Sequence, residues 1–205
     1  MIKKPLKFLV PAFLVLVTNA GLSSENDARI LVEDFHTTLL DVMKNAESLG
    51  FQGRYDRLAP SITEKFDTPL ISRVILSRYW KELSPEQQLK FIQLFTKLSI
   101  STYASRFDSY AGEEFKTVGI EALKKGRLLV RTELLRKNEE SVKFEYLVHQ
   151  KDGIWYIISV IADGVNDLSV KRSEYASIIS ERGFDSLLGE IENKIEDLNK
   201  TTTGG

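Results

Sequence analysis

A change in hydrophobic periodicity near Glu113 constrains the fold of this 205-residue chain more than any other feature. Before it, apolar side chains recur every three or four positions, as on one face of a helix, whereas over 114–162 they alternate, as in strands. Helical spacing returns after Gly164. We therefore expect an α+β fold in which a curved antiparallel meander of about four strands is covered by N-terminal and C-terminal helices.

Two helices are expected at the start of the mature chain. The first is predicted over residues 26–49, because Gly50 suits a helix end. The second is predicted over residues 53–65, with a kink or break at Pro60, because proline lacks the backbone N–H of a helix interior.

Capping residues mark two further helix starts. Asp67-Thr68-Pro69 can begin a third helix, with proline near the first helical position. Ser84-Pro85-Glu86-Gln87 predicts a capping box, in which the serine and glutamine side chains each accept a hydrogen bond from the other residue's backbone N–H. This fourth helix is expected to continue to Ala111-Gly112.

Alternation predicts which residues face inward in the sheet. Val118, Ile120 and Ala122 are expected to share one face of the first strand, which turns at Lys125-Gly126. The buried faces expected for the next two strands are Leu128, Val130, Thr132 and Leu134 in one, and Val142, Phe144, Tyr146 and Val148 in the other. Residues 154–162 are apolar at successive positions, so the last strand is expected to be covered on both sides.

The first twenty residues have the layout of a secretory signal peptide. Three lysines give a basic start, and the apolar run 8–17 is too short to span a bilayer, which takes about 20 residues. Cleavage is expected near Ala20, and a short anchor that stays attached is the alternative. We expect a mature protein that is soluble outside the cytoplasm, with one domain over 21–200 and a disordered tail over 201–205.

Composition argues against several functions. The chain has no cysteine, and therefore no disulfide, no thiolate nucleophile and no cysteine for a lipoprotein anchor. Without the leader, 25 of the 28 basic residues remain against 29 acidic ones, which argues against nucleic acid as a partner. His36 and His149 lack metal-ligand spacing and no glycine-rich phosphate loop occurs, so we expect neither a metal nor a cofactor.

The segment 69–95 carries more apolar and aromatic bulk than a helix pair needs, which suggests that it helps to hold an apolar ligand. Plain core packing is one alternative, because apolar stripes usually bury against their own domain. A small isomerase or lipid-modifying enzyme is another, in which Asp108 or Asp163 would act with Tyr146 or Tyr156, although either aspartate can simply serve a turn or a helix end. A scaffold protein with a solid core is the third.

Several short motifs occur in the order found in one known family. They are Phe66-Asp67-x-Pro69-Leu70-Ile71, Arg78-Tyr79-Trp80, Ser84-Pro85-Glu86-Gln87 with Phe91 and Phe95, Thr102-Tyr103-Ala104, Asp152-Gly153-x-Trp155 and Gly164-Val165. As a set they resemble the MlaC-like (toluene-tolerance) periplasmic lipid-binding proteins of Gram-negative bacteria, which are auxiliary proteins of ABC transporters. After Gly164 the sequence is more similar to the hopanoid-associated HpnM branch, and Ser159 stands where the phospholipid branch would have an aspartate.

The resemblance implies an NTF2-like sheet that encloses an apolar cavity, and a periplasmic carrier that shuttles hopanoid or phospholipid between the inner and outer membranes without catalysis. It also implies two partners, an inner-membrane lipid transporter complex and an outer-membrane donor or acceptor. The residues expected to contact lipid are Phe35, Leu39, Val74, Trp80, Phe91, Phe95, Tyr103, Val130, Leu134, Phe144, Tyr146 and Val148. Arg73, Arg78 and Arg172 are expected to contact a head group or a partner, with solvated salt bridges as the alternative.

Overall fold

The computed structural model describes residues 20–203, with side chains over 24–200. The helices are α1 (Ala20–Lys44), α2 (Ala46–Lys65), α3 (Thr68–Leu76), α4 (Pro85–Arg106), α5 (Asp167–Arg182), α6 (Phe184–Thr203) and the short 3-10 segments η1 (Ser77–Glu82) and η2 (Lys124–Gly126). The strands are β1 (Glu114–Leu123), β2 (Arg127–Leu135), β3 (Val142–Lys151), β4 (Ile154–Ala162) and β5 (Val165–Asn166). The predicted signal peptide lies outside the described residues, apart from Ala20.

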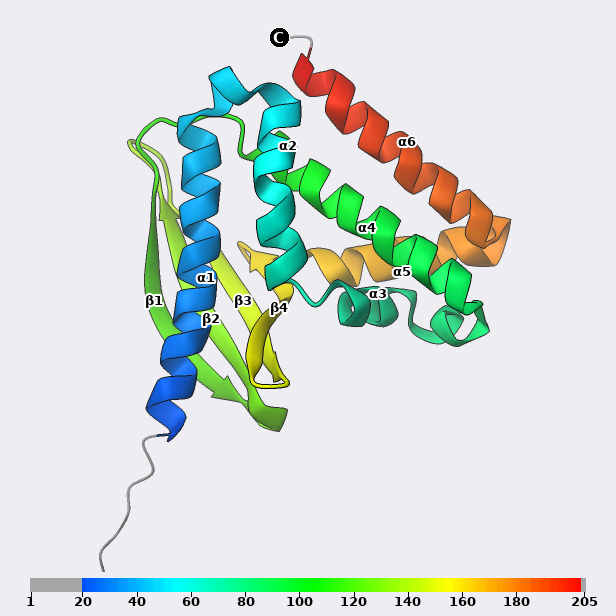
Figure 1. The fold of residues 1–205 in the computed structure, drawn as a ribbon, viewed down its shortest axis with the longest axis horizontal. Helices are drawn as coiled ribbons and strands as arrows, with labels where there is room; N and C mark the ends of the chain where they lie inside the picture. The colour runs from blue at the N-terminus through cyan, green and yellow to red at the C-terminus, as the bar shows by residue number, and fades with distance from the viewer. Residues whose placement is uncertain (1–19, 204–205) are drawn as a thin grey trace, which may run out of the picture.

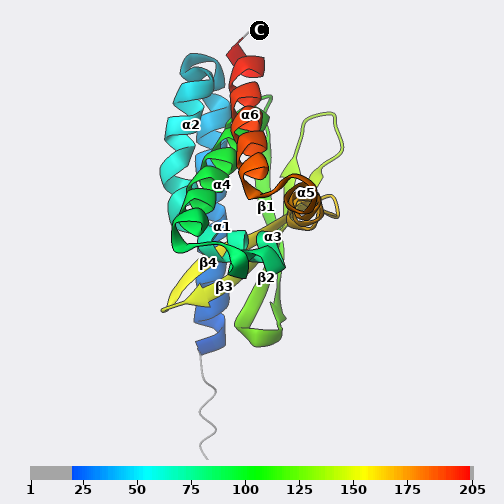
Figure 2. The same cartoon turned by 90° about the vertical axis from the view of Figure 1, so that its right-hand side faces the viewer.

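The sheet confirms the expected α+β class. Its strands pair antiparallel in the order β1-β2-β3-β4-β5, and β5, which was not predicted, is only two residues long. Figure 1 shows α1 and α2 in front of the sheet, while α3, α4, α5 and α6 extend beyond its β4 side. The turned view in Figure 2 shows α5 end-on, with α4 and α6 to one side of it.

The predicted faces of β2 and β3 are confirmed, and that of β1 is wrong only at Val118. In β2, burial alternates so that Leu128, Val130 and Leu134 face inward. Ile120 and Ala122 pair with Val130 and Leu128 and share their face, as predicted. A bulge between Thr117 and Gly119 shifts the register, so Val118 is 49% exposed, and the alternation in sequence does not reveal this shift.

Strand β4 is covered on both sides, as predicted. A register shift opposite Leu147 and Val148 allows the consecutive residues Ile157 and Ile158 both to be buried. Ile157 packs with residues of α1 and α2, whereas α3 and α5 contact β4 at the groove that Ile158 lines.

Local signals predicted the starts of α3 and α4 correctly, whereas α1 begins at Ala20 and α2 at Ala46, earlier than predicted. Asp67 Oδ1 accepts a hydrogen bond from the Leu70 N–H at 3.0 Å, and Ser84 and Gln87 form the predicted capping box. The predicted break at Pro60 is wrong, since α2 continues through this exposed residue, where water can satisfy the freed carbonyl, and the non-helical angles occur at Gly50. Helix α4 ends at Arg106, before the predicted stop, because the next residue turns its ring into the core.

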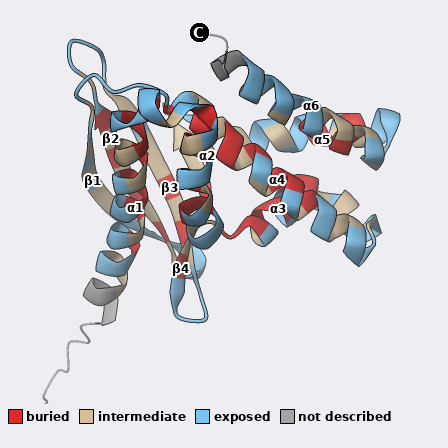
Figure 3. Ribbon diagram, turned by 45° about the horizontal axis from the view of Figure 1, so that its top comes forward, coloured by how far each residue is buried: buried red, intermediate tan, exposed pale blue. Residues whose placement is uncertain are grey.

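Buried side chains form two cores, and Figure 3 colours the buried positions along the helices and strands red. The first core lies between the sheet and α1, α2 and part of α4, and includes Phe35, Leu39 and Tyr146. The second joins α3, α4, α5 and α6 around Phe91 and Leu187. Helix α4 therefore connects a layer built on the sheet to a layer built only of helices.

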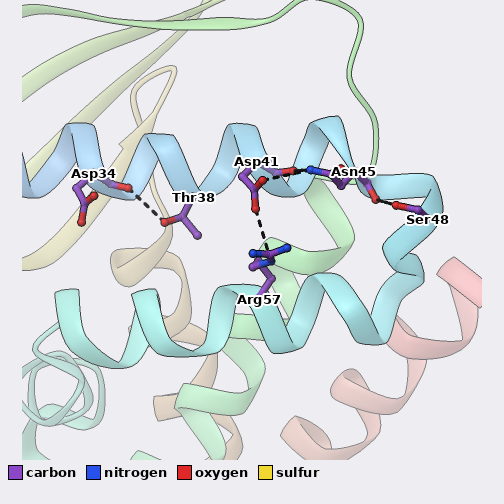
Figure 4. A network of polar contacts seen from close by, with 6 residues as sticks. All are labelled: Asp34, Thr38, Asp41, Asn45, Ser48 and Arg57. Atoms are coloured by element: carbon purple, nitrogen blue, oxygen red, sulfur yellow. Dashed lines mark hydrogen bonds and ion pairs between the residues drawn. The ribbon is translucent and has the colours of Figure 1, made fainter.

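The polar contacts made by arginines of α2 differ greatly in burial. Figure 4 shows the exposed pair Asp41 and Arg57, whose Oδ2 and Nε atoms are 3.5 Å apart. Arg54, on the same helix as Arg57, is only 3% exposed, and it donates from Nε to the Ala104 carbonyl at 2.8 Å and from Nη1 to the Ala46 carbonyl at 3.0 Å. Arg54 thus ties the start of α2 to the last turn of α4.

His36 lies in the first core as a neutral side chain. Its Nε2 atom is 3.0 Å from the Tyr146 hydroxyl, and its ring stacks on Phe115 with the ring centroids 3.9 Å apart. Burial lowers the pKa of His36 from 6.5 to about 3. Protonation in the folded state is therefore strongly disfavoured.

We predict that this histidine makes the protein less stable in mild acid. Below pH 6.5 His36 is protonated in the unfolded chain, whereas in the folded protein it stays neutral down to about pH 3. The contribution of neutral His36 to stability is therefore complete above pH 6.5 and is lost as the pH falls below that value. The loss between pH 7 and pH 5 should be about 2 kcal/mol greater in the wild type than in His36→Gln, measured by urea unfolding. Equal pH dependence of the two proteins would contradict the prediction.

Candidate binding site

A cavity of about 540 Å³ lies between α4, α5 and one end of the inner sheet face; we call it the main cavity. Its apolar walls include Phe95 and Leu98 of α4, Leu134 of β2 and Phe144 of β3, and Phe66 closes part of it. Small-molecule sites in proteins typically measure roughly 300–1,000 Å³, so the main cavity is large enough to hold a ligand.

Ordinary helical and strand periodicities bring these residues together. Phe95, Leu98 and Thr102 are three and four positions apart, which places them on one face of α4. In β3, Val142 and Phe144 are two positions apart and share the inner face of the sheet. The cavity thus lies where one face of α4 passes the end of one face of the sheet.

Charged side chains gather where the lining is more exposed, at the ends of several elements. Arg106 is the last residue of α4. Its Nη1 atom is 3.9 Å from Asp167 Oδ2, and the two side chains are about two-thirds and one-half exposed. Arg136, just after β2, donates from Nε to the Glu140 carbonyl at 2.9 Å and pairs through Nη1 with Glu139 Oε2 at 2.6 Å. Lys171, in the second turn of α5, has no ion-pair partner among the described residues.

With Glu113, the lining of this rim carries three cations and two carboxylates, and Glu139 pairs with Arg136 from outside the lining. Lys171, the rim cation without an ion-pair partner among the described residues, suits an anionic group placed next to the apolar interior.

The interior of the main cavity offers few groups for chemistry. Burial raises the pKa of the Tyr103 hydroxyl, which therefore stays neutral. Ser159 is buried, and its hydroxyl has no hydrogen-bond partner in the part of the chain that the structure describes. Among the residues described by the structure, no group of three or more His, Cys, Asp or Glu side chains could hold a metal ion. This arrangement is suited to enclosing apolar chains.

Four of the residues predicted to contact lipid line the main cavity, namely Phe95, Tyr103, Leu134 and Phe144. Another group lies in the first core instead: Phe35, Leu39, Val130, Tyr146 and Val148. The rings of Phe35 and Tyr146 meet edge to face, 6.4 Å between centroids, so the space that could have been a cavity there is filled. Lipid contact by any of these residues remains a prediction.

The remaining predicted residues lie outside the main cavity. Phe91 is in the second core, Trp80 packs half-buried against it, and Val74 is 46% exposed. None of the three predicted arginines lines the main cavity: Arg73 is exposed, Arg78 stacks on its neighbour Tyr79, and Arg172 donates from Nη2 to Ser77 Oγ at 2.8 Å.

Sequence reasoning missed the charged rim itself. Arg106, Arg136 and Lys171 each lie near an end of a helix or strand. The predicted order of helices and strands could have shown that these residues lie close to loops. It could not show that three separate element ends meet at one opening.

Among the described residues, no hydrogen bond joins Asp108 or Asp163 of the enzyme alternative to Tyr146 or Tyr156. Asp163 accepts a hydrogen bond from the Lys143 backbone N–H at 2.8 Å, in an exposed turn. Asp108 is exposed just after α4, and the Tyr146 hydroxyl is hydrogen-bonded to His36. The turn role considered for Asp163 is the one the structure shows.

The fold and the main cavity define the class of this protein, an α+β domain with a large apolar cavity between its sheet and its helices. Comparison with known proteins then identifies its family. The family model described as MlaC protein matches residues 33–193, and the chain belongs to the MlaC family. Among the described residues, no helix is both long and apolar enough to cross a membrane.

Two relatives cover most of the chain. The intermembrane phospholipid transport system binding protein MlaC of Haemophilus influenzae is 20% identical over 197 residues, which span 91% of this chain and 89% of that protein. The structure is similar, with a TM-score of 0.75 and 21% identity, to a phospholipid-binding protein of Ralstonia solanacearum solved in complex with a phospholipid. That match covers 84% of this chain and 98% of the Ralstonia chain. The closer similarity to the HpnM branch stays a prediction.

Proposed function

We propose that the protein is a periplasmic carrier that encloses the apolar chains of a membrane lipid and moves the lipid between the inner and outer membranes. The main cavity carries this proposal, because it combines an apolar interior with a charged rim at which Lys171 has no ion-pair partner among the described residues. The names of the two relatives, one a phospholipid transport binding protein and the other a phospholipid-binding protein, support it.

A carrier solves a simple energetic problem. Each methylene exposed to water costs about 0.8 kcal/mol, so a chain of about 15 methylenes would cost on the order of 12 kcal/mol to move unshielded. An apolar cavity replaces most of this exposure by contacts with Phe95, Leu98 and Phe144. No bond of the lipid needs to change, so the lipid leaves as it entered.

We favour phospholipid over hopanoid as the ligand. Arg106 and Lys171 can face a phosphate while the chains lie deeper, and charge-assisted hydrogen bonds of this kind are stronger than neutral ones. Hopanoid remains the second candidate because the segment after Gly164 is similar to the HpnM branch. An inner-membrane transporter complex and an outer-membrane donor or acceptor are the proposed partners.

Native mass spectrometry of protein purified from the periplasm of a Gram-negative host tests this function. We expect one bound lipid, and extraction should identify it as intact phospholipid. The protein mass should also show that the chain begins near residue 21, as the predicted signal peptide requires. A ligand-free protein that takes up neither phospholipid nor hopanoid would overturn the proposal, and a hopanoid alone would overturn the preferred ligand.

A further inference from the structure

A second hollow, of about 200 Å³, lies between α3, α5 and the outer side of β3 and β4; we call it the outer groove. Its apolar part is formed by Leu70 and Val74 of α3, Leu147 of β3 and Ile158 of β4. Helices α3 and α5, which form its two sides, are in contact, and they lie next to each other in Figures 1 and 2.

The polar groups of the outer groove are dominated by hydrogen-bond donors. Arg127 and Arg172 line it, no aspartate or glutamate does, and neither arginine has a carboxylate partner among the described residues. Among the described residues, the guanidinium group of Arg172 donates from Nη2 to Ser77 Oγ at 2.8 Å, and that of Arg127 has no hydrogen-bond partner. Two guanidinium groups beside an apolar surface are suited to bind a ligand that has both an anionic oxygen and an apolar part.

Two further groups in the outer groove support an anion. Asn166 uses its Oδ1 atom to cap α5, accepting from the N–H groups of Leu168 and Ser169, which leaves its amide NH₂ able to donate. Ser159 is 6% exposed and its buried hydroxyl has no partner. The first turn of α5 also lies at the groove, and a helix N-terminus carries partial positive charge.

We propose that the outer groove binds a single-chain amphiphilic anion, a short alkyl chain that ends in phosphate or carboxylate. The anionic head lies between Arg127 and Arg172, and the chain lies along Leu70, Val74 and Ile158. A volume of about 200 Å³ is below the roughly 300 Å³ at which small-molecule sites usually begin, so the groove holds a short chain rather than a second two-chain lipid.

The outer groove shares part of its wall with the main cavity. Ile71, Ser159 and Leu168 line both hollows. An occupant of the groove therefore contacts side chains that also contact the proposed lipid. Any change in lipid affinity caused by the occupant must be matched by an equal change in the occupant's own affinity, because coupling between two binding sites is reciprocal.

Titration of the full-length protein with octyl phosphate tests the proposal by calorimetry and by methyl NMR. We expect the methyl signals of Val74 and Ile158 to shift, while those of Leu134 in the main cavity do not. Octanoate should give the same pattern. Neutral octyl glucoside and inorganic phosphate should bind at least about tenfold more weakly, because each lacks either the charge or the chain.

The double variant Arg127→Gln/Arg172→Gln should lose about 10- to 100-fold in affinity for octyl phosphate, since hydrogen bonds to charged groups are each worth about a tenfold factor or more. Arg57→Gln is the matched control, because this exposed arginine lines neither hollow. Both proteins should unfold at the wild-type temperature. Octyl phosphate binding that survives in the double variant, or that shifts only Leu134, would overturn the proposal. The result does not depend on whether the main cavity carries lipid.

Discussion

A protein carrying Ser99→Trp and Thr102→Trp is expected to lose lipid binding by about 100-fold. Both residues lie on α4 three positions apart and line the main cavity. Two indole rings there would occupy space that the lipid chains need. If they exclude only three or four methylenes, about 3 kcal/mol of binding free energy is lost, which corresponds to about 100-fold in affinity.

The fold should tolerate these changes. The Ser99 hydroxyl donates to the Phe95 carbonyl at 2.9 Å and the Thr102 hydroxyl to the Leu98 carbonyl at 2.8 Å, so both hydrogen bonds lie within α4. The matched control is Gln93→Trp with Lys97→Trp, which adds the same two rings to exposed positions of the same helix outside the cavity.

The measurement is binding of a fluorescent phospholipid to delipidated protein, with circular dichroism to verify folding. The control variant should bind like the wild type. A folded Ser99→Trp/Thr102→Trp variant that also binds like the wild type would place the lipid elsewhere.

The second large effect is expected for stability. Arg54→Met should lower the free energy of unfolding by about 2–4 kcal/mol, because the Ala46 and Ala104 carbonyls would lose their buried donor. Burial lowers the pKa of Arg54, which shows that its environment opposes the charge, yet the two hydrogen bonds hold it in place.

The control for this effect is Arg57→Met, one turn further along α2. Its partner Asp41 is 3.5 Å away and both side chains are about half exposed, so the loss should be at most about 1 kcal/mol. Urea unfolding of the three proteins at pH 7 makes the comparison. Equal losses in the two variants would show that Arg54 is not the tie between α2 and α4.

The position of the main cavity follows from the two cores. Ile100 and Ala104 of α4 pack in the first core, whereas Leu94, Phe95 and Leu98 pack in the second. Neither core extends fully over the region where the helix passes from one to the other. A cavity at such a junction can stay open without leaving either core underpacked.

Some elements of the fold could be predicted because their causes are local. The capping box at Ser84 depends on residues three positions apart, and it forms as predicted. The buried face of β2 follows from simple alternation. The alternation in β1 failed at the bulge near Val118, because a bulge is fixed by the pairing with the next strand.

The candidate site could be predicted only in part. Tyr103 and Phe144 were expected to line a cavity, and they do, because an apolar residue on an inward face has a fair chance of meeting a void. Phe35 and Tyr146 lie on inward faces too, but their rings meet each other. Sequence patterns show which side chains face the interior of the protein. They do not show whether the space next to those side chains is filled by other residues or left open as a cavity.

The sequence by itself determined the α+β class, the starts of α3 and α4, the buried faces of the central strands and, through its motifs, membership of the MlaC family. Only the tertiary structure decided where the main cavity lies, which cations surround it and that an outer groove shares its wall. The physical reason is the distance along the chain between the residues that determine each feature. Caps and alternation depend on neighbours along the chain, whereas a void and its rim depend on how residues as distant as Met43 and Lys171 pack in space.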